Sequence, residues 1–389
     1  MANIMDYLDW RGDISLEVDP FNEVDSLILS ELAYVRFDGV LNEGFDEICT
    51  LAEASERFFE LHGEEDLEKD DSFVRMMPLL MRRAAGTSRF RTMRLTGYVN
   101  VVSEEDDQQM AALTFLPDDG SAYVAFRGTD NSVVGWKEDF NLSFMTETPG
   151  QRSAAEYLKE AARLPGEPFR VGGHSKGGNF AVFASSFCDA AVQERIDEVY
   201  TNDGPGFLPE VVEKDGYKRV LGRIRSIIPA GSIFGLLLRS GYSHEIVASS
   251  EKGIQQHDGM SWQVIRNGFV KVPETTRTSI FMEKTLDNWI RGIPMDERKA
   301  FVDAFFDLID EAGIDTAAEF TGSMKKKLEM LKSFPTLPEE EQKVIKSTLA
   351  ELIKSGVGTL TDNIKAPRVL KGRRTHRIGT GLKKSIENT

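Results

Sequence analysis

The sequence predicts an α/β fold in which a mainly parallel sheet is flanked by helices. Between residues 95 and 272, short apolar strand-like runs alternate with helical segments, and such helical crossovers are what parallel strands require. The composition is that of a globular chain. Of 389 residues, 41% are hydrophobic and 9% aromatic, which allows a sizeable core and excludes a wholly disordered protein.

The individual elements follow from the spacing of apolar residues and from turn signals. Strands are expected at 95–102, 110–115, 121–127, 169–172, 198–202, 223–229, 242–249 and 262–272. Helices are expected at 45–61, 135–145, 153–164, 175–189, 275–292, 295–312, 316–333 and 338–354. Gly63 and the acidic run 64–71 are expected to form a linker or an exposed loop.

This pattern divides the chain into four parts. We expect an acidic N-terminal extension packed on the core (1–72), an α/β core (73–274), a C-terminal helical region (275–363) and a basic tail (364–389). The helical region contains no motif with a known chemistry. It is therefore expected to pack against the core or to offer an interaction surface.

The formal net charge of −16 is unevenly distributed. Residues 1–72 contain 21 acidic and 4 basic side chains, whereas residues 364–389 carry a net charge of +7. A strongly acidic front end repels nucleic acid, so no nucleic-acid partner is expected. The tail is expected to be a solvated end, or to meet the acidic front end or a neighbouring subunit of a homo-oligomer.

The cysteines and the N-terminus indicate a location. Cys49 and Cys188 are too few for a disulfide framework, which favours a reducing compartment. The first ten residues lack the basic and apolar regions of a secretory signal. The longest near-apolar stretch, 227–238, is shorter than the roughly 20 residues of a membrane helix. We therefore expect a cytoplasmic protein without a transmembrane segment.

The sharpest motif is Gly173-His174-Ser175-Lys176-Gly177, which matches the G-x-S-x-G pattern. An apolar strand precedes it and a helix of small residues follows, which is the strand–turn–helix frame that this motif requires. In this frame the serine projects from the carboxyl edge of a sheet at a helix N-terminus. The motif predicts Ser175 as a nucleophile, with a non-catalytic glycine-rich turn as the alternative.

A serine hydroxyl needs a base, usually a histidine. The order serine, acid, histidine of α/β hydrolases favours a histidine downstream of Ser175, which leaves His244 and His257. We prefer His257, because it lies in the loop 253–259 between two expected strands, whereas His244 lies inside a strand.

The acid that would orient the histidine is predicted from its place in the sheet. Asp203 directly follows the expected strand 198–202, at the carboxyl edge. Its alternative role is a turn that caps the following helix.

An oxyanion hole would use two backbone N–H groups, one from Lys176 and one from Thr129 after the strand 121–127. The expected substrate-contacting residues are Gly128, His174 and Ser232. The apolar segments 135–149 and 233–238 could shape an acyl pocket or a lid, or could be plain core. The sequence has no phosphate-binding loop, no complete dinucleotide fingerprint and no histidine pair at metal-ligand spacing, so no cofactor or metal is expected.

Several of these motifs resemble known families. Residues 124–129 and 172–178 resemble the V-x-F-R-G-T and G-H-S-x-G-G segments of class 3 lipases. A closer resemblance is to the uncharacterised bacterial α/β hydrolases called Mbeg1-like, and it covers roughly residues 1–275. The residues that carry it are 7–13, 20–25, 173–179, 203–207 and 256–258. The resemblance implies an α/β-hydrolase fold and a serine hydrolase of unestablished substrate.

The resemblance also implies roles for residues: Ser175 as nucleophile, His257 as base, and Thr129 with Lys176 as oxyanion donors. Class 3 lipases place their aspartate after the strand that matches 223–228, where this chain has Ile228-Pro229-Ala230-Gly231-Ser232 and no acid. Either Asp203 has taken over this role, or a serine–histidine pair is helped by Ser232.

The sequence thus predicts hydrolysis of a carboxylic ester or thioester, a small-molecule acyl substrate, through an acyl-serine intermediate. Three alternatives stay open. They are a non-catalytic scaffold of the same fold that binds a partner, an acyltransferase, and a serine peptidase on the same triad.

Overall fold

The computed structural model describes residues 1–63, 73–130, 132–314, 316, 319–320 and 323–365. Within these residues, eight strands form one sheet in chain order, and two short strands form a separate hairpin. The sheet contains β1 (Cys49–Thr50), β2 (Arg94–Ser103), β3 (Gln108–Leu116), β4 (Ala122–Phe126), β5 (Phe169–His174), β6 (Ile196–Asn202), β7 (Ile224–Pro229) and β8 (His244–Val247). The hairpin pairs β9 (Val264–Ile265) with β10 (Gly268–Phe269).

Strands β1 to β4 pair antiparallel, and β4 to β8 pair parallel. Because parallel strands run the same way, the carboxyl ends of β4 to β8 meet at one edge of the sheet, where α/β proteins bind ligands. The helices are α1 (Ile4–Arg11), α2 (Glu23–Leu32), α3 (Leu51–Leu61), α5 (Met77–Ala85), α6 (Val133–Asn141), α7 (Pro149–Ala161), α8 (Lys176–Phe187), α9 (Ala190–Arg195), α10 (Pro209–Val212), α11 (Asp215–Val220), α12 (Arg277–Gly292), α13 (Met295–Glu311), α15 (Met324–Ser333) and α16 (Glu339–Lys365). Short 3-10 turns include η3 (Phe234–Leu236) and η4 (Gly253–His257).

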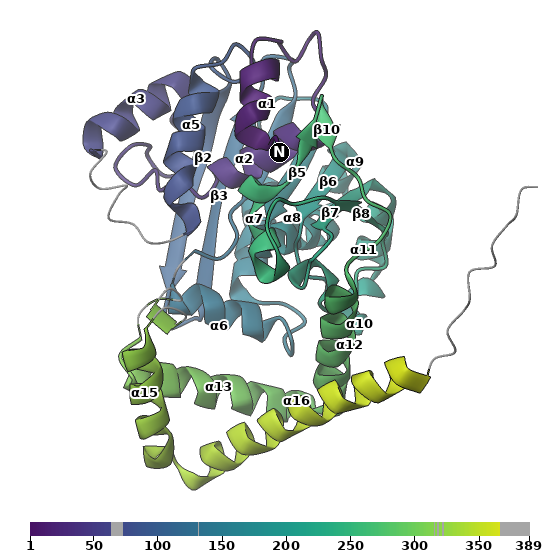
Figure 1. Ribbon diagram of the computed structural model, residues 1–389. Coiled ribbons are helices and arrows are strands. Elements are labelled where there is room, and N and C mark those ends of the chain that lie inside the picture. The colour runs from purple at the N-terminus through teal and green to yellow at the C-terminus, as the bar shows by residue number, and fades with distance from the viewer. Residues whose placement is uncertain (64–72, 131, 315, 317–318, 321–322, 366–389) are drawn as a thin grey trace, which may run out of the picture.

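Helices cover both faces of the sheet, as Figure 1 shows. Successive side chains of a strand point to opposite faces. On β4, Tyr123 and Ala125 therefore join the buried cluster of α1, α2, α3 and α5, while Val124 and Phe126 join the cluster of α7, α8 and α11. This arrangement confirms the expected mainly parallel sheet flanked by helices, and its order and the turn after β5 are those of an α/β-hydrolase fold.

The acidic N-terminal segment is built into the first of these clusters. Asp25 of α2 is fully buried and accepts hydrogen bonds from Arg89 Nε at 2.8 Å and from Tyr7 Oη at 2.9 Å. A buried charge requires such partners, so this network ties α1 and α2 to the segment that leads into β2. The domain boundaries near residues 72 and 274 stay predictions.

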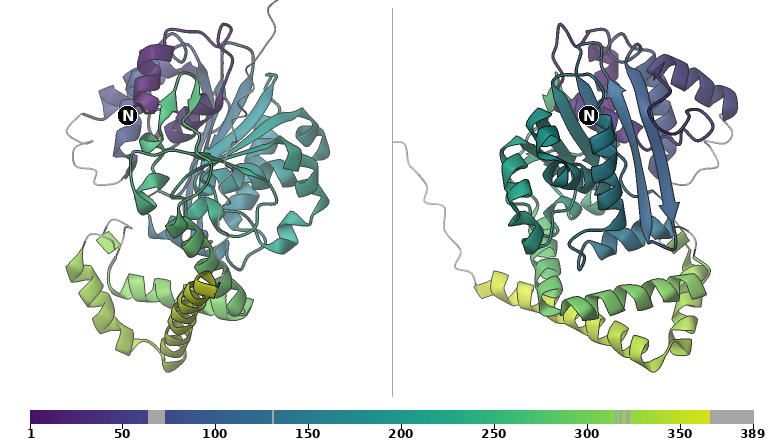
Figure 2. Two further views of the ribbon diagram at one scale, coloured as in Figure 1. Left: turned by 45° about the vertical axis from the view of Figure 1, so that its right-hand side comes forward. Right: turned by 180° about the vertical axis from the view of Figure 1, so that it is seen from behind.

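The C-terminal helices lie at the opposite end of the molecule from α1 and α2 (Figures 1 and 2). Helix α12 leads from the α/β body to α13, α15 and α16. A third buried cluster joins them to α6: Phe301, Phe306 and Ile345 are buried there, with Trp136 and Phe140 packed against them. The helical region therefore packs directly against the segment that follows β4.

Several predicted elements differ from the observed ones. The helix predicted at 45–61 begins only at Leu51, because Cys49 and Thr50 pair with β2 and the Thr50 side chain caps α3. The strand predicted at 262–272 is the β9–β10 hairpin, which turns at Arg266, a residue with a φ of 59°. Within the range 316–333, predicted as one helix, residues 319–320 are helical and α15 spans Met324–Ser333. The helix predicted at 338–354 is α16, which continues to Lys365. The acidic run 64–71 and the tail beyond residue 365 lie outside the described residues.

Candidate active site

Ser175 occupies a strained turn between β5 and α8. Its φ of 57° and ψ of −131° lie in a region that non-glycine residues rarely adopt. A Cβ on Gly177 would lie 2.1 Å from the carbonyl oxygen of Phe126, so only glycine lets α8 begin this close to β4. The geometry is that of a nucleophile elbow, as the motif predicts.

Gly128 brings the loop after β4 against the same turn. A Cβ there would lie 2.1 Å from Tyr34 Oη and 3.0 Å from the Ser175 Cβ. A side chain at position 128 would therefore separate this loop from the turn at Ser175. Gly128 itself is not among the residues that line the cavity described below.

Asp203 and His257 come together at the carboxyl edge of the sheet. Asp203 follows β6 and is fully buried, and His257 ends η4. Asp203 Oδ2 lies 2.6 Å from His257 Nδ1. Because a carboxylate only accepts hydrogen bonds, Nδ1 carries the proton, which leaves Nε2 of the imidazole as an acceptor.

The second carboxylate oxygen of Asp203 is also occupied. Oδ1 accepts hydrogen bonds from the Ser232 hydroxyl and, at 3.2 Å, from the backbone N–H of Gly235. These donors fix the position of the carboxylate beside His257. The Ser232 hydroxyl therefore contacts the carboxylate of Asp203.

Ser175 and His257 line one cavity, together with Thr129 and Lys176. Within the described part of the chain, the Ser175 hydroxyl makes no hydrogen bond. Bonds between a nucleophile and its base are often long until substrate tightens the site. The structure therefore brings Asp203 and His257 into contact, and His257 lines the same cavity as Ser175.

His174 is buried and holds the backbone of His257. Its Nε2 lies 2.8 Å from the carbonyl oxygen of His257, and its Nδ1 lies 3.1 Å from Tyr34 Oη. Burial lowers the pKa of His174 well below its ordinary value, so the ring is neutral. Nε2 then donates to the carbonyl and Nδ1 accepts from Tyr34.

The other histidine considered as a base lies apart from this pair. His244 stands on β8, and its Nδ1 is 2.8 Å from Ser226 Oγ. It does not line the cavity. His174 and Ser232, expected to touch substrate, are not among the lining residues either, and their contacts are with His257 and Asp203.

Thr129 is held by a half-buried acid. Its Oγ1 donates to Asp139 Oδ2 at 2.6 Å, and both residues line the cavity. Burial raises the pKa of Asp139 to about 6, although nearby Lys176 acts in the opposite direction. No sequence signal marked this residue, because a single aspartate on an amphipathic helix is usually exposed.

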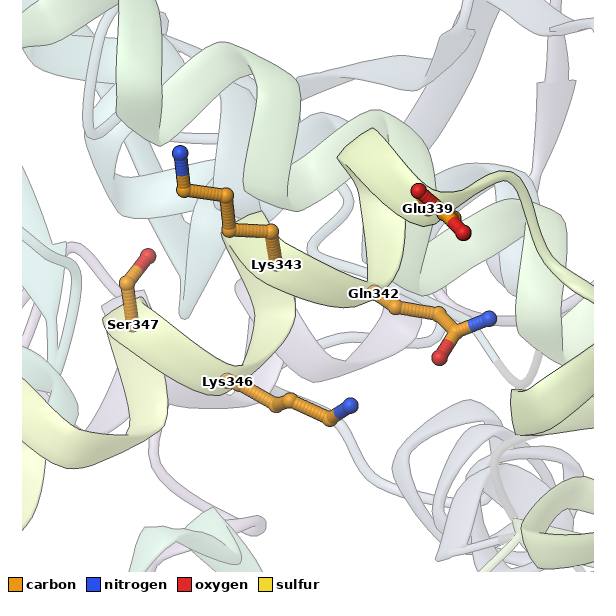
Figure 3. Close-up of a pocket in the computed structure, with 5 residues that line it drawn as sticks. All are labelled: Glu339, Gln342, Lys343, Lys346 and Ser347. Carbon is orange, nitrogen blue, oxygen red and sulfur yellow. The ribbon is translucent and has the colours of Figure 1, made fainter.

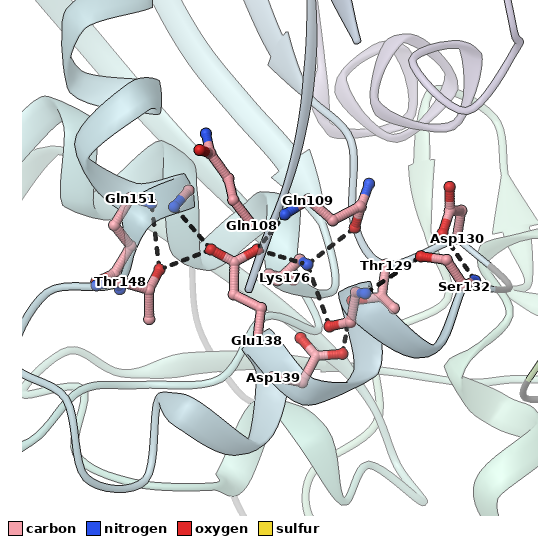
Figure 4. Close-up of polar contacts among 12 residues, drawn as sticks. Gln108, Gln109, Thr129, Asp130, Ser132, Glu138, Asp139, Thr148, Gln151 and Lys176 are labelled. Carbon is pink, nitrogen blue, oxygen red and sulfur yellow. Dashed lines mark hydrogen bonds and ion pairs between the residues drawn. The ribbon is translucent and has the colours of Figure 1, made fainter. Parts of the chain in front are cut away.

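Lys176 begins α8 and carries a buried side chain (Figure 4). Its Nζ lies 3.0 Å from Glu138 Oε2 and 2.9 Å from Gln109 Oε1. Glu138 also accepts from Thr148 Oγ1 at 3.0 Å and from the backbone N–H of Gly150 at 2.7 Å. This ion pair anchors the start of α8. The first backbone N–H groups of that helix have no acceptor inside the helix.

The cavity has a volume of about 650 Å³ and a mainly apolar lining. The segments 135–149 and 233–238, predicted as a possible acyl pocket, both contribute to it. The C-terminal helical region contributes a further wall from α12 and α13, which consists of Met282, Leu286, Trp289, Ile290, Phe301 and Val302. Sequence reasoning missed this wall, since an amphipathic helix face does not reveal what it faces.

The sheet, the elbow and the aspartate–histidine pair together define a protein of the α/β-hydrolase fold. The chain belongs to the Mbeg1-like family, because the model of that family matches residues 84–307. The matched range includes the elbow, Asp203, His257, α12 and most of α13, and it begins after the N-terminal motifs that suggested the resemblance. The expected resemblance is thereby confirmed.

No curated protein matches the chain. Among solved structures, one described as the crystal structure of M37 lipase is similar, with 15% sequence identity and a TM-score of 0.33. The match covers 56% of this chain and 70% of that chain. No described helix is long and apolar enough to cross a membrane. Among the described residues, no group of three or more histidine, cysteine, aspartate or glutamate side chains is arranged to hold a metal.

Proposed function

We propose that the protein is a serine hydrolase that cleaves a carboxylic ester or thioester through an acyl-serine intermediate. The observation that carries the proposal is the 2.6 Å contact between Asp203 and His257, together with the apolar cavity that both His257 and Ser175 line. With Nδ1 bound to Asp203, the free Nε2 of His257 can take the hydroxyl proton of Ser175.

In the first half-reaction, Ser175 Oγ attacks the acyl carbon while its proton moves to His257 Nε2. The buried carboxylate of Asp203 stabilises the imidazolium that forms. The negative charge on the acyl oxygen is stabilised by the backbone N–H groups of Thr129 and Lys176. The imidazolium then gives its proton to the leaving alcohol or thiol, and the bond between that group and the acyl carbon breaks.

In the second half-reaction, His257 takes a proton from water, which attacks the acyl-serine ester. The tetrahedral adduct collapses, the proton returns to Ser175 Oγ, and a carboxylic acid leaves. Two residues would position the histidine without touching substrate: His174 through the carbonyl of His257, and Ser232 through Asp203.

The cavity supports an acyl substrate over a peptide. Its walls are mostly aliphatic and aromatic, and each methylene group that leaves water for such a site gains about 0.8 kcal/mol. A peptide backbone would bring N–H and C=O groups that these walls cannot satisfy. We also propose a cytoplasmic location, which the free thiols of Cys49 and Cys188 support.

The test combines active-site labelling with turnover. Wild-type protein should react with a fluorophosphonate probe and hydrolyse p-nitrophenyl butyrate. Ser175→Ala should lose both activities and keep its circular-dichroism melting curve. Ser143→Ala is the matched control, because Ser143 lines the same cavity without being at the elbow.

The outcomes separate the alternatives. A folded wild-type protein that neither labels nor cleaves esters of four to twelve acyl carbons would be a non-catalytic scaffold. Transfer of the acyl group to an added alcohol or amine, in preference to water, would make it an acyltransferase. Preferred cleavage of amides would make it a peptidase.

A further inference from the structure

The two outermost C-terminal helices each expose an apolar face. On α15 the exposed residues are Met324, Leu328 and Leu331, and on α16 they are Leu349, Ile353 and Val357. Met324 is 77% exposed, Leu331 70% and Ile353 69%. Residues three or four positions apart lie on one side of a helix, so each set forms a continuous stripe. We call the six residues the outer stripe.

The outer stripe is distinct from the faces that hold these helices in the fold. Met330 of α15 and Ile345 of α16 already pack into the cluster shared with α6. Both helices therefore have a second apolar face that no described residue covers. On a soluble surface, contiguous apolar patches of this kind mark an interaction site.

Basic side chains are in excess on α15, whereas the sequence of α16 contains four lysines and five acidic residues. Helix α15 contains four lysines and one glutamate. On α16, Lys343 and Lys346 project from the helix around a shallow surface hollow (Figure 3). The acidic residues Glu339, Glu340 and Glu341 stand in the first turn of α16, ahead of the stripe, and Glu351 pairs with Lys354 at 3.0 Å.

The charge continues beyond the described residues. The chain runs on from Lys365, and the sequence of residues 366–389 holds seven basic side chains and one acidic side chain. An apolar stripe beside lysines, followed by a basic segment, supplies the two signals that bind a protein to an anionic lipid surface.

Helix α16, which carries half of the outer stripe, also forms part of the wall of the candidate active site. Thr348 of α16 lines the cavity, and the next residue, Leu349, belongs to the stripe. The Trp289 indole of α12, itself a lining residue, donates to the Thr348 carbonyl at 3.0 Å. A molecule that settles against the stripe is therefore one helix away from the apolar cavity.

We propose that the outer stripe docks the protein on an anionic lipid surface, with α15 and α16 lying along the surface. A second copy of the chain fits less well, because the lysines beside the stripe would face one another. That the docked protein draws acyl substrate from this surface into the cavity rests on the function proposed above. The docking itself does not.

The test measures flotation of the full-length chain with vesicles of phosphatidylcholine alone or with 30% phosphatidylglycerol. Wild type should float with the anionic vesicles, less so with the neutral ones, and less at 0.5 M salt than at 0.1 M salt. Leu331→Gln/Ile353→Gln should lower the partition coefficient about tenfold or more, because two apolar side chains no longer enter the interface. Ile265→Gln is the matched control, since Ile265 is 58% exposed on the distant β9–β10 hairpin.

Three results would overturn the proposal: no flotation of wild type, equal flotation of the stripe variant, or an equal loss with Ile265→Gln. If wild type is a dimer that binds no vesicles, and the stripe variant is a monomer, the stripe is instead an interface between two copies of the chain. Hydrolysis of p-nitrophenyl butyrate without vesicles reports on Ser175 alone. Failure of the proposed function and failure of the docking are thereby separate results.

Discussion

Asp203→Asn tests the candidate triad most directly, because the substitution changes one heavy atom of a fully buried side chain that contacts His257. The carboxylate accepts from His257 Nδ1 at 2.6 Å. The amide that replaces it can retain an oxygen toward Ser232 and Gly235, and its NH₂ group then faces the imidazole. To accept from that NH₂ group, the ring must carry its proton on Nε2, where it can no longer take the proton of Ser175.

The expected loss is in turnover rather than in folding. A wrong histidine tautomer lowers the rate by roughly 10³- to 10⁴-fold in triad hydrolases, which corresponds to about 4 to 5.5 kcal/mol of transition-state stabilisation. The melting temperature should change by only a few degrees, since the hydrogen bonds from Ser232 and Gly235 can persist. The assay is kcat/KM for p-nitrophenyl butyrate, with thermal unfolding in the same buffer.

Asp258→Asn is the control for this prediction. Asp258 adjoins His257 in the chain, but its carboxylate caps the Met260 N–H at 2.9 Å, a hydrogen bond that asparagine can keep. Its kcat/KM should stay within about threefold of wild type. If Asp203→Asn kept a third or more of wild-type kcat/KM, Asp203 would not be the acid and the reasoning from the Nδ1 contact would be wrong.

Three further predictions concern the surroundings of the pair. Asp139 has a pKa of about 6 in the fold and about 3.8 when unfolded, so the native state loses stability as pH rises between these values. Because Asp139→Asn cannot titrate there, its unfolding free energy, measured by urea titration, should rise by roughly 2 kcal/mol relative to that of wild type between pH 4 and pH 7. A difference that stays constant over this pH range would contradict the prediction. Lys176→Met should cost about 3 to 5 kcal/mol in urea unfolding because it strands the buried Glu138 carboxylate, and adding Glu138→Gln should recover part of that loss; additive losses would refute the buried pairing. Leu286→Asp places a charge in the cavity wall and should reduce kcat/KM for an eight-carbon acyl ester at least tenfold more than for a four-carbon ester, whereas equal reductions would show that the acyl chain does not contact α12.

Much of the fold was predictable, because periodicity reports local structure. Seven of the eight strands in the described sheet were expected within about two residues, and so was the helix after the elbow. The exceptions are segments whose secondary structure depends on tertiary contacts. Cys49 and Thr50 are strand only because β2 offers them an edge, and the hairpin after η4 depends on the left-handed backbone of Arg266.

The candidate site was predicted unevenly for a similar reason. The elbow around Ser175 is local, since strand, turn, small residues and helix lie within one continuous segment. The partnership of Asp203 with His257 spans 54 residues, and the sequence could only propose it from strand ends and chain order. His174 and Ser232 were expected at the substrate, and their contacts with His257 and Asp203 could not be read from a motif.

What the sequence by itself determined is the set of features whose residues are neighbours in the chain: the α/β alternation, the elbow at Ser175, and the acidic front end. Only the tertiary structure decided that the acidic front end joins the core through Asp25, and that the C-terminal helices wall the cavity. An amphipathic pattern states that a helix has an apolar face. Which surface that face meets depends on packing between segments that are distant in the chain, and this packing cannot be read from the local sequence pattern.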